Sequence, residues 1–141
     1  MSHTVLFVCT GNYYRSRYAE LLFNALRVSD WQATSRGLAL SPYNQGPIWP
    51  PVLERLQQRG LAILGAIRAP LMLQDVDLER ATYVIALNEP EHRPLMQQLF
   101  PAWVDQITYW QIPDVNVLAA DQAFDLIERE ITALTQALLA R

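Results

Sequence analysis

The chain has 141 residues, of which 51% are hydrophobic and 18% charged. This composition suits one globular domain over residues 1–141 and excludes disordered, collagen-like and coiled-coil proteins. Acidic residues outnumber basic ones by 14 to 11, a formal net charge of −3, which argues against a general nucleic-acid binder. All eleven basic residues are arginines, which excludes a lysine Schiff base and the lysine-bearing phosphate loop of common nucleotide triphosphatases.

The cysteine and histidine content limits the compartment and the cofactors. Cys9 is the only cysteine, so an intramolecular disulfide is excluded and a reducing, cytoplasmic location is expected. His3 and His92 lie far apart, without metal-ligand spacing, so neither a metal nor another cofactor is expected. No apolar run approaches the ~18 residues that span a membrane, and no signal peptide is visible. We therefore expect no membrane partner.

The first third of the chain predicts a strand, a tight loop, a helix and a second strand. Thr4–Val8 is a short apolar, β-branched run, typical of a strand buried on both faces. A helical pattern begins near Arg15, with apolar residues three and four apart. Trp31–Ser35 predicts the second strand. Residues 37–51 contain four prolines and two glycines, and the length of this surface loop suggests a functional one.

The rest of the chain continues the alternation of helices and strands. Residues 61–73 are apolar but irregular and predict no element. Periodicity and bounding prolines or glycines predict a helix over 50–60, a strand over 82–87, a helix over 89–100, a strand over 107–110 and a final amphipathic helix through 124–138. This order predicts a three-layer α/β fold, in which about four parallel strands form a twisted sheet with helices on both faces.

The loop after the first strand contains a pattern with a specific chemical use. It reads CTGNYYRS over residues 9–16, so Cys9 is followed six positions later by Arg15. A loop of this length can wrap its backbone N–H groups around one tetrahedral oxyanion, with a helix N-terminus pointing at the same place. The arginine then binds two oxygens of the anion through two parallel hydrogen bonds. These positive surroundings favour a thiolate nucleophile.

Other residues of the same loop are expected to shape it and to bind the substrate. Ser16 can donate a hydrogen bond to the thiolate. The same bond stabilises the thiolate when it later acts as the leaving group. Gly11 and Asn12 tolerate the positive φ angles that a tight phosphate cradle requires. The remaining predicted binding residues in the loop are Thr10, Tyr13 and Tyr14.

The segment Val8–Glu20, VCTGNYYRSRYAE, resembles the signature of the low-molecular-weight protein tyrosine phosphatases and of the related thioredoxin-coupled arsenate reductases. The resemblance extends along the whole chain and includes Gly60, Thr82–Leu87, Asp114 and Phe124. It implies that Cys9 attacks phosphorus and forms a phosphocysteine, while Arg15 stabilises the transition state. It also implies that Asp114 first protonates the leaving oxygen and then activates water.

Several positions depart from the family pattern. Asp114 is followed by valine where the family usually has proline, and Asp121 is a weaker candidate for the acid. Tyr13 stands where tyrosine phosphatases have a branched apolar residue and phosphoarginine phosphatases have threonine. Arg17 stands where tyrosine phosphatases favour proline, and a polar residue there resembles the reductases.

These observations predict a cysteine-dependent phosphomonoester hydrolase, with protein phosphotyrosine as the favoured substrate class. Tyr43 and Trp49 of the long loop are candidate walls of an aromatic cleft. The expected partners are a phosphorylated protein or a small phosphomonoester, with phosphate or other oxyanions binding in the loop. The alternatives are a protein-arginine phosphatase, an arsenate reductase that uses an external thiol, and a phosphate-binding module without turnover.

Overall fold

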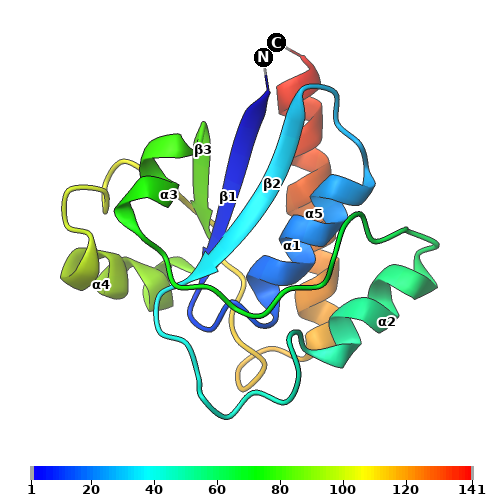
Figure 1. Cartoon of the computed structure of the whole chain (residues 1–141), viewed down its shortest axis with the longest axis horizontal. Helices are drawn as coiled ribbons and strands as arrows, with labels where there is room; N and C mark the ends of the chain where they lie inside the picture. The colour runs from blue at the N-terminus through cyan, green and yellow to red at the C-terminus, as the bar shows by residue number, and fades with distance from the viewer. Residues whose placement is uncertain (1, 141) are drawn as a thin grey trace.

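The computed structural model describes residues 2–140 and confirms the predicted α/β fold (Figure 1). The elements follow one another along the chain in the order β1 His3–Cys9, α1 Arg15–Ala25, β2 Trp31–Gly37, α2 Pro50–Gln58, α3 Asp75–Arg80, β3 Tyr83–Ala86, α4 Glu89–Leu99, β4 Thr108–Tyr109 and α5 Ala120–Leu139. All neighbouring strands pair in parallel, in the spatial order β2-β1-β3-β4. β1 is therefore a central strand.

The central strand β1 separates two hydrophobic clusters. Val5 and Phe7 belong to the larger cluster, which includes buried side chains of α1 and α5. Leu6 and Val8 point to the other face, where they share a cluster with residues of α3 and α4. This alternation is the two-residue period of a strand that is covered on both faces. Figure 1 shows the same layers, with α1 and α5 on one side of the sheet and α3 and α4 on the other.

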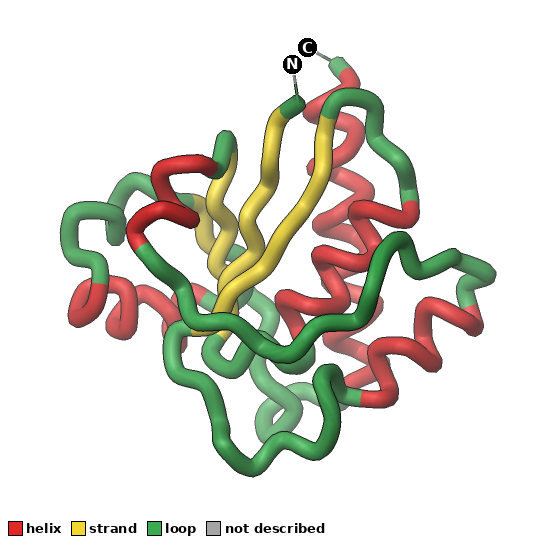
Figure 2. Tube along the Cα trace, in the orientation of Figure 1, coloured by secondary structure: helices red, strands yellow, loops and turns green. Residues whose placement is uncertain are grey.

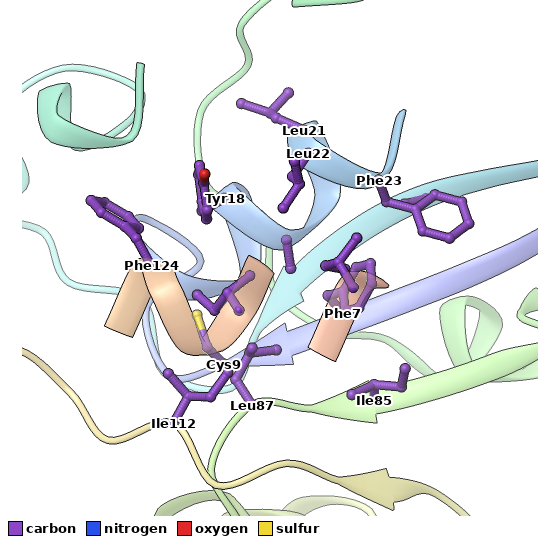
Figure 3. Close-up of a cluster of buried hydrophobic side chains, with 14 of the residues drawn as sticks. Phe7, Cys9, Tyr18, Leu21, Leu22, Phe23, Ile85, Leu87, Ile112 and Phe124 are labelled. Atoms are coloured by element: carbon purple, nitrogen blue, oxygen red, sulfur yellow. The ribbon is translucent and has the colours of Figure 1, made fainter. Parts of the chain in front are cut away.

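Aromatic side chains fill the larger cluster (Figure 3). The Phe7 and Phe23 rings meet edge to face with centroids 6.4 Å apart, and the Tyr18 and Phe124 centroids are 4.6 Å apart. Cys9 is the last member of β1 in this cluster and is only 2% exposed. Packing of the strand thus fixes the position of the predicted nucleophile.

Loops gather beyond the carboxyl ends of the strands, where parallel sheets bind ligands (Figure 2). The loops that follow β1, β2 and β4 all begin at this edge. The start of β1 and the end of α5 lie at the opposite end of the sheet. The topology therefore brings together three segments that are distant in the sequence.

Two regions differ from the sequence prediction in detail. Helix α3 was not predicted, because six residues are too few to establish a helical period. A capping box at its start, in which Gln74 N–H donates to Asp77 Oδ2 at 2.9 Å, stabilises this short helix. The last strand, β4, has only two residues.

Within residues 2–140, no helix combines the length and hydropathy required to cross a bilayer.

An ion-pair cluster joins α2 to α5 and to α1. Arg55 Nε donates to Glu128 Oε2 at 2.9 Å, and Arg55 also pairs with Asp125. Arg59 Nη2 lies 3.2 Å from Glu128 Oε1, and the Tyr18 hydroxyl donates to Glu128 Oε2 at 2.6 Å. Burial of Glu128 favours its neutral form, but the donors from Arg55, Tyr18 and Arg59 outweigh this effect and lower its pKa to about 2.

We predict that Glu128→Gln lowers the free energy of unfolding at pH 7 by about 1–3 kcal/mol, because it weakens charge-assisted hydrogen bonds. The carboxyl pKa is lower in the folded state than its ordinary value of 4.5. The stabilisation is therefore complete above pH 4.5 and is lost as the pH falls toward 2. Urea unfolding of both proteins from pH 7 to pH 3 should show the difference narrowing. Glu130→Gln, at an exposed position of α5, is the control. If the difference in unfolding free energy between wild type and Glu128→Gln stays constant with pH, Glu128 does not have a lowered pKa in the folded protein.

Candidate active site

The loop between β1 and α1 forms a compact turn around the predicted nucleophile. Cys9 ends the strand, Arg15 begins the helix, and the Cys9 Sγ lies 2.9 Å from the Ser16 Oγ. A hydroxyl at this distance can donate a hydrogen bond to a thiolate. Figure 3 shows Cys9 at the end of its strand, beside Leu87 and Ile112.

Asn12 is the structural centre of the loop. Its φ of 51° is in the left-handed region, and its side chain is completely buried. The Nδ2 group donates to Ser16 Oγ and to Ser35 Oγ, each at 2.9 Å. Its Oδ1 accepts from the Leu71 amide and from Arg68 Nη1, each at 3.0 Å. The Asn12 amide thus uses both donors and both lone pairs to hold the loop in shape.

Gly37, opposite Cys9 in the β1–β2 pairing, allows the loop to pack closely on β2. A Cβ at this position would lie 2.8 Å from the Thr10 carbonyl oxygen and 3.0 Å from the Asn12 Cβ. Any larger residue would therefore push against the phosphate loop.

Two arginines lie behind the loop, and neither role was predicted. Arg17 is 2% exposed and donates to the Pro47 carbonyl at 2.9 Å and to the Arg68 carbonyl at 2.7 Å. Arg68 donates to the Ser35 carbonyl at 2.8 Å and lies 3.2 Å from Glu20 Oε1. Burial lowers the pKa of both arginines, and for Arg17 the neighbouring charge of Arg68 lowers it further. Together they connect the loops before and after α2 to the phosphate loop.

The Arg15 guanidinium is held in a two-bond pair with Glu91, a residue of α4. Arg15 Nη1 donates to Glu91 Oε1 at 2.9 Å, and Nη2 donates to Oε2 at 2.7 Å. Nη1 also donates to the Ile112 carbonyl at 2.8 Å. Burial opposes the charge on Arg15, but the bonds to Glu91 and the nearby Cys9 and carboxylates outweigh it and raise the Arg15 pKa.

Glu91 is itself surrounded by donors. The Thr10 hydroxyl donates to Glu91 Oε2 at 2.5 Å, and His92 Nε2 lies 3.2 Å from the same oxygen. His92 Nδ1 accepts from the Asn88 amide at 2.9 Å, so the neutral ring carries its proton on Nε2. Burial lowers the His92 pKa, which favours this neutral form. Burial raises the Glu91 pKa, but the surrounding donors outweigh this and hold it well below its usual range.

Sequence reasoning missed Glu91 and His92 because no local pattern connects the start of α4 with a loop about eighty residues earlier. The available signal was topological. β3 pairs with β1, so the helix that follows β3 begins beside the phosphate loop.

A cleft of about 390 Å³ opens above Cys9. It is lined by the phosphate loop, the loop before α2 and the loop before α5, specifically by Cys9, Thr10, Gly11, Tyr13, Tyr14, Arg15, Ala39, Ser41, Asn44, Trp49, Asp114 and Val115. The structure therefore brings most of the predicted site residues to one cleft. Asn12 and Ser16 are buried behind it.

Aromatic side chains form one wall of this cleft. The Tyr13 hydroxyl donates to the Gln45 carbonyl at 2.7 Å. The Tyr14 ring packs edge to face on Trp49 and Phe124, with centroid distances of 4.7 and 5.5 Å. Burial raises the Tyr14 pKa to about 12, so its hydroxyl stays protonated.

Tyr43 does not form a cleft wall, which corrects the sequence prediction. Its side chain is 89% exposed, whereas Ser41 and Asn44 of the same loop line the cleft. The Tyr43 amide donates to the Ser41 hydroxyl at 3.2 Å, and this local turn leaves the tyrosine at the surface.

Asp114 lies at the mouth of the cleft, on the loop between β4 and α5. Its side chain is 47% exposed, and Oδ2 lies 3.7 Å from Arg15 Nη2. Oδ1 accepts from the Val115 amide at 2.7 Å, a bond that a proline at this position could not make. Asp121, the weaker candidate, lies 3.7 Å from Arg55 and does not line the cleft.

A cysteine and an arginine that face one cleft at the carboxyl edge of a four-stranded parallel sheet define a phosphatase of the phosphate-loop class. The family model for low molecular weight phosphotyrosine protein phosphatases matches residues 4–141, and the chain belongs to this family. A comparison with curated proteins found no match.

Solved structures similar to this chain include enzymes with different reactions. The low molecular weight protein tyrosine phosphatase from T. tengcongensis is 28% identical, with a TM-score of 0.75 and 99% of each chain covered. The YwlE arginine phosphatase from Geobacillus stearothermophilus is 22% identical, with a TM-score of 0.80 over 98% of this chain and 94% of that one. A thioredoxin-dependent arsenate reductase from Corynebacterium glutamicum is 24% identical, with a TM-score of 0.72. The match covers 99% of this chain and 64% of the reductase chain.

We predict that Asn12→Ala destabilises the protein by about 2–4 kcal/mol, because it leaves buried partners without hydrogen bonds and places alanine in the left-handed region. Asn12→Gly loses the same bonds but tolerates the positive φ, so it should be about 1 kcal/mol more stable than Asn12→Ala. Chemical unfolding measures the free energy of unfolding of wild type and of both variants. Equal or reversed stabilities would show that the backbone conformation is not the constraint.

Proposed function

We propose that the protein hydrolyses phosphomonoesters through a phosphocysteine, with protein phosphotyrosine as its substrate class. The observation that carries this proposal is the convergence of Cys9, Arg15 and Asp114 on one cleft with an aromatic wall. Family membership supports the phosphatase reaction, while the substrate class rests on the geometry of the cleft.

In the first step, the loop amides and Arg15 bind the phosphate, and the Cys9 thiolate attacks phosphorus. A sulfur–phosphorus bond forms while the bond to the leaving oxygen breaks. Asp114 donates its proton to that oxygen, so the alcohol leaves uncharged. The Arg15 guanidinium and the amides stabilise the negative charge on the equatorial oxygens of the transition state.

In the second step, water attacks the phosphocysteine and inorganic phosphate leaves. The Asp114 carboxylate, deprotonated by the first step, accepts a proton from this water. The sulfur–phosphorus bond breaks, and the Ser16 hydroxyl, 2.9 Å from the sulfur, stabilises the departing thiolate. Asp114 is half-exposed, which gives water access to the position it needs.

The walls of the cleft favour an aromatic leaving group. Tyr13 and Trp49 offer ring surfaces on which a phenyl group can pack. The Tyr13 hydroxyl is fixed by Gln45, so this wall keeps its shape without a ligand. Residues 38–49 carry no charged side chain, and a neutral phenol therefore fits this wall better than a charged guanidinium.

Arsenate reduction is a weaker candidate because it requires reducing thiols. Cys9 is the only cysteine in the sequence, so each cycle would need an external thiol such as glutathione. We place the protein in the cytoplasm, because a nucleophile of this kind needs a reducing compartment.

A turnover panel tests the proposal. Phosphotyrosine, phosphoserine and phosphoarginine peptides are compared, with arsenate plus glutathione as a further reaction. We expect the highest kcat/KM for phosphotyrosine and no steady-state turnover by Cys9→Ser, which retains the anion site but lacks the thiolate. Higher kcat/KM for phosphoarginine would overturn the substrate class. A burst of phosphate release that stalls at the phosphocysteine would identify a binding module, and steady-state turnover by Cys9→Ser would exclude the covalent intermediate.

We predict that Asp114→Asn slows alkyl and tyrosyl phosphates about 10²–10⁴-fold, because these leaving groups need a proton as the bond breaks. An aryl phosphate whose phenol has a low pKa releases its phenolate without help from an acid. Hydrolysis of such substrates should therefore be slowed much less. The matched control is Asp121→Asn, which changes a carboxylate outside the cleft. Equal slowing of every substrate would place the general acid elsewhere.

A further inference from the structure

We propose that Glu91 is a positioning residue, which fixes the Arg15 guanidinium so that one particular edge faces the anion. This inference rests on the proposed function, because it assigns the role of Arg15 in binding the phosphoryl group. It adds a residue of α4 to a site otherwise built from the three loops that line the cleft.

Counting the hydrogen-bond donors of Arg15 shows which edge is available. A guanidinium has five N–H donors. The end edge, formed by Nη1 and Nη2, is occupied by the two carboxylate oxygens of Glu91. The second hydrogen of Nη1 is directed to the Ile112 carbonyl. The side edge, formed by Nε–H and the second Nη2 hydrogen, therefore remains for a two-bond contact with phosphate.

Glu91 can hold this orientation because its own carboxylate is fixed. Oε2 accepts from Thr10 Oγ1 at 2.5 Å and lies 3.2 Å from His92 Nε2, while Oε1 accepts from Asn88 Nδ2 at 3.3 Å. His92 is completely buried and anchored to the backbone amide of Asn88. Arg15 is thus positioned against the first turn of α4 as well as by its own loop.

The charge of Glu91 gives the proposal a distinctive consequence. A carboxylate beside the anion site weakens the attraction between Arg15 and a phosphate dianion in the ground state. The Glu91 carboxylate instead favours catalysis by orienting the Arg15 guanidinium, and this orientation matters most in the transition state. Removing the charge should therefore impair turnover without impairing phosphate binding. A merely structural role would impair both.

The test compares Glu91→Gln with wild-type protein. The amide oxygen still accepts one N–H from Arg15, but the amide nitrogen faces the other N–H and forces the guanidinium to turn. We expect kcat on an aryl phosphate to fall at least 10-fold, while the Kd of inorganic phosphate, measured by calorimetry, stays within threefold or tightens. Glu89→Gln is the matched control in the same helical turn, because Glu89 pairs with Arg93 instead, and its kcat should be unchanged.

A second variant separates orientation from charge. Glu91→Asp keeps the carboxylate but withdraws it by one methylene, so it cannot reach both guanidinium nitrogens in the same geometry. We expect a similar loss of kcat. Wild-type kcat in either Glu91→Gln or Glu91→Asp would overturn the proposal, and so would parallel losses of kcat and phosphate affinity. If Glu91→Gln fails to fold, Glu91→Asp alone decides between these outcomes.

Alkylation of Cys9 tests positioning without turnover. Iodoacetate carries a carboxylate that Arg15 can guide to the thiolate, whereas iodoacetamide is neutral. We expect wild-type protein to react preferentially with iodoacetate and Glu91→Gln to lose most of this preference. If the wild type hydrolyses no substrate of the panel but shows this pattern, the proposed function fails and the positioning role stands. An unchanged preference in the variant would overturn the positioning role, whatever the turnover.

Discussion

Burial of β1 on both faces is the constraint on which the rest of the structure depends. The alternating side chains of this strand belong to two separate hydrophobic clusters, one with α1 and α5 and one with α3 and α4. Because both faces are packed, the strand cannot shift its register without exposing apolar side chains. Its last residue, Cys9, therefore has a fixed position at the carboxyl edge of the sheet, and the phosphate loop begins from a rigid support.

The loop itself is held from two directions. Behind it, Asn12 connects the loop to Ser35 of β2 and to Arg68 in the segment between α2 and α3. Beside it, Glu91 of α4 holds Arg15. A short loop with a left-handed residue needs such supports, because a sparsely populated backbone conformation persists only where its surroundings hold it. The precision of the site thus comes from polar groups that do not line the cleft themselves but hold the residues that do.

The sequence was sufficient to predict the fold class and the loop that follows the first strand. Strong signals carried both predictions: a short buried strand, a helix that begins at Arg15, and a cysteine at the required spacing. The supports could not be predicted, because they depend on which loops the sheet brings together. Arg68 lies in a segment without any periodic pattern, and Glu91 differs from other glutamates at helix starts only through its neighbours in space. Tyr43 was misplaced for the related reason that composition does not give the direction of a loop side chain.

The solitary thiol has a consequence for oxidative damage. A peroxide that reached Cys9 would convert it to a sulfenic acid, and the chain has no second cysteine to capture that species as a disulfide. The side chain within hydrogen-bond distance of the sulfur is Ser16, whose Oγ lies 2.9 Å away, and a hydroxyl cannot act as a resolving thiol. Recovery therefore depends on a small thiol that enters through the cleft. The same opening that admits the substrate controls both inactivation and repair.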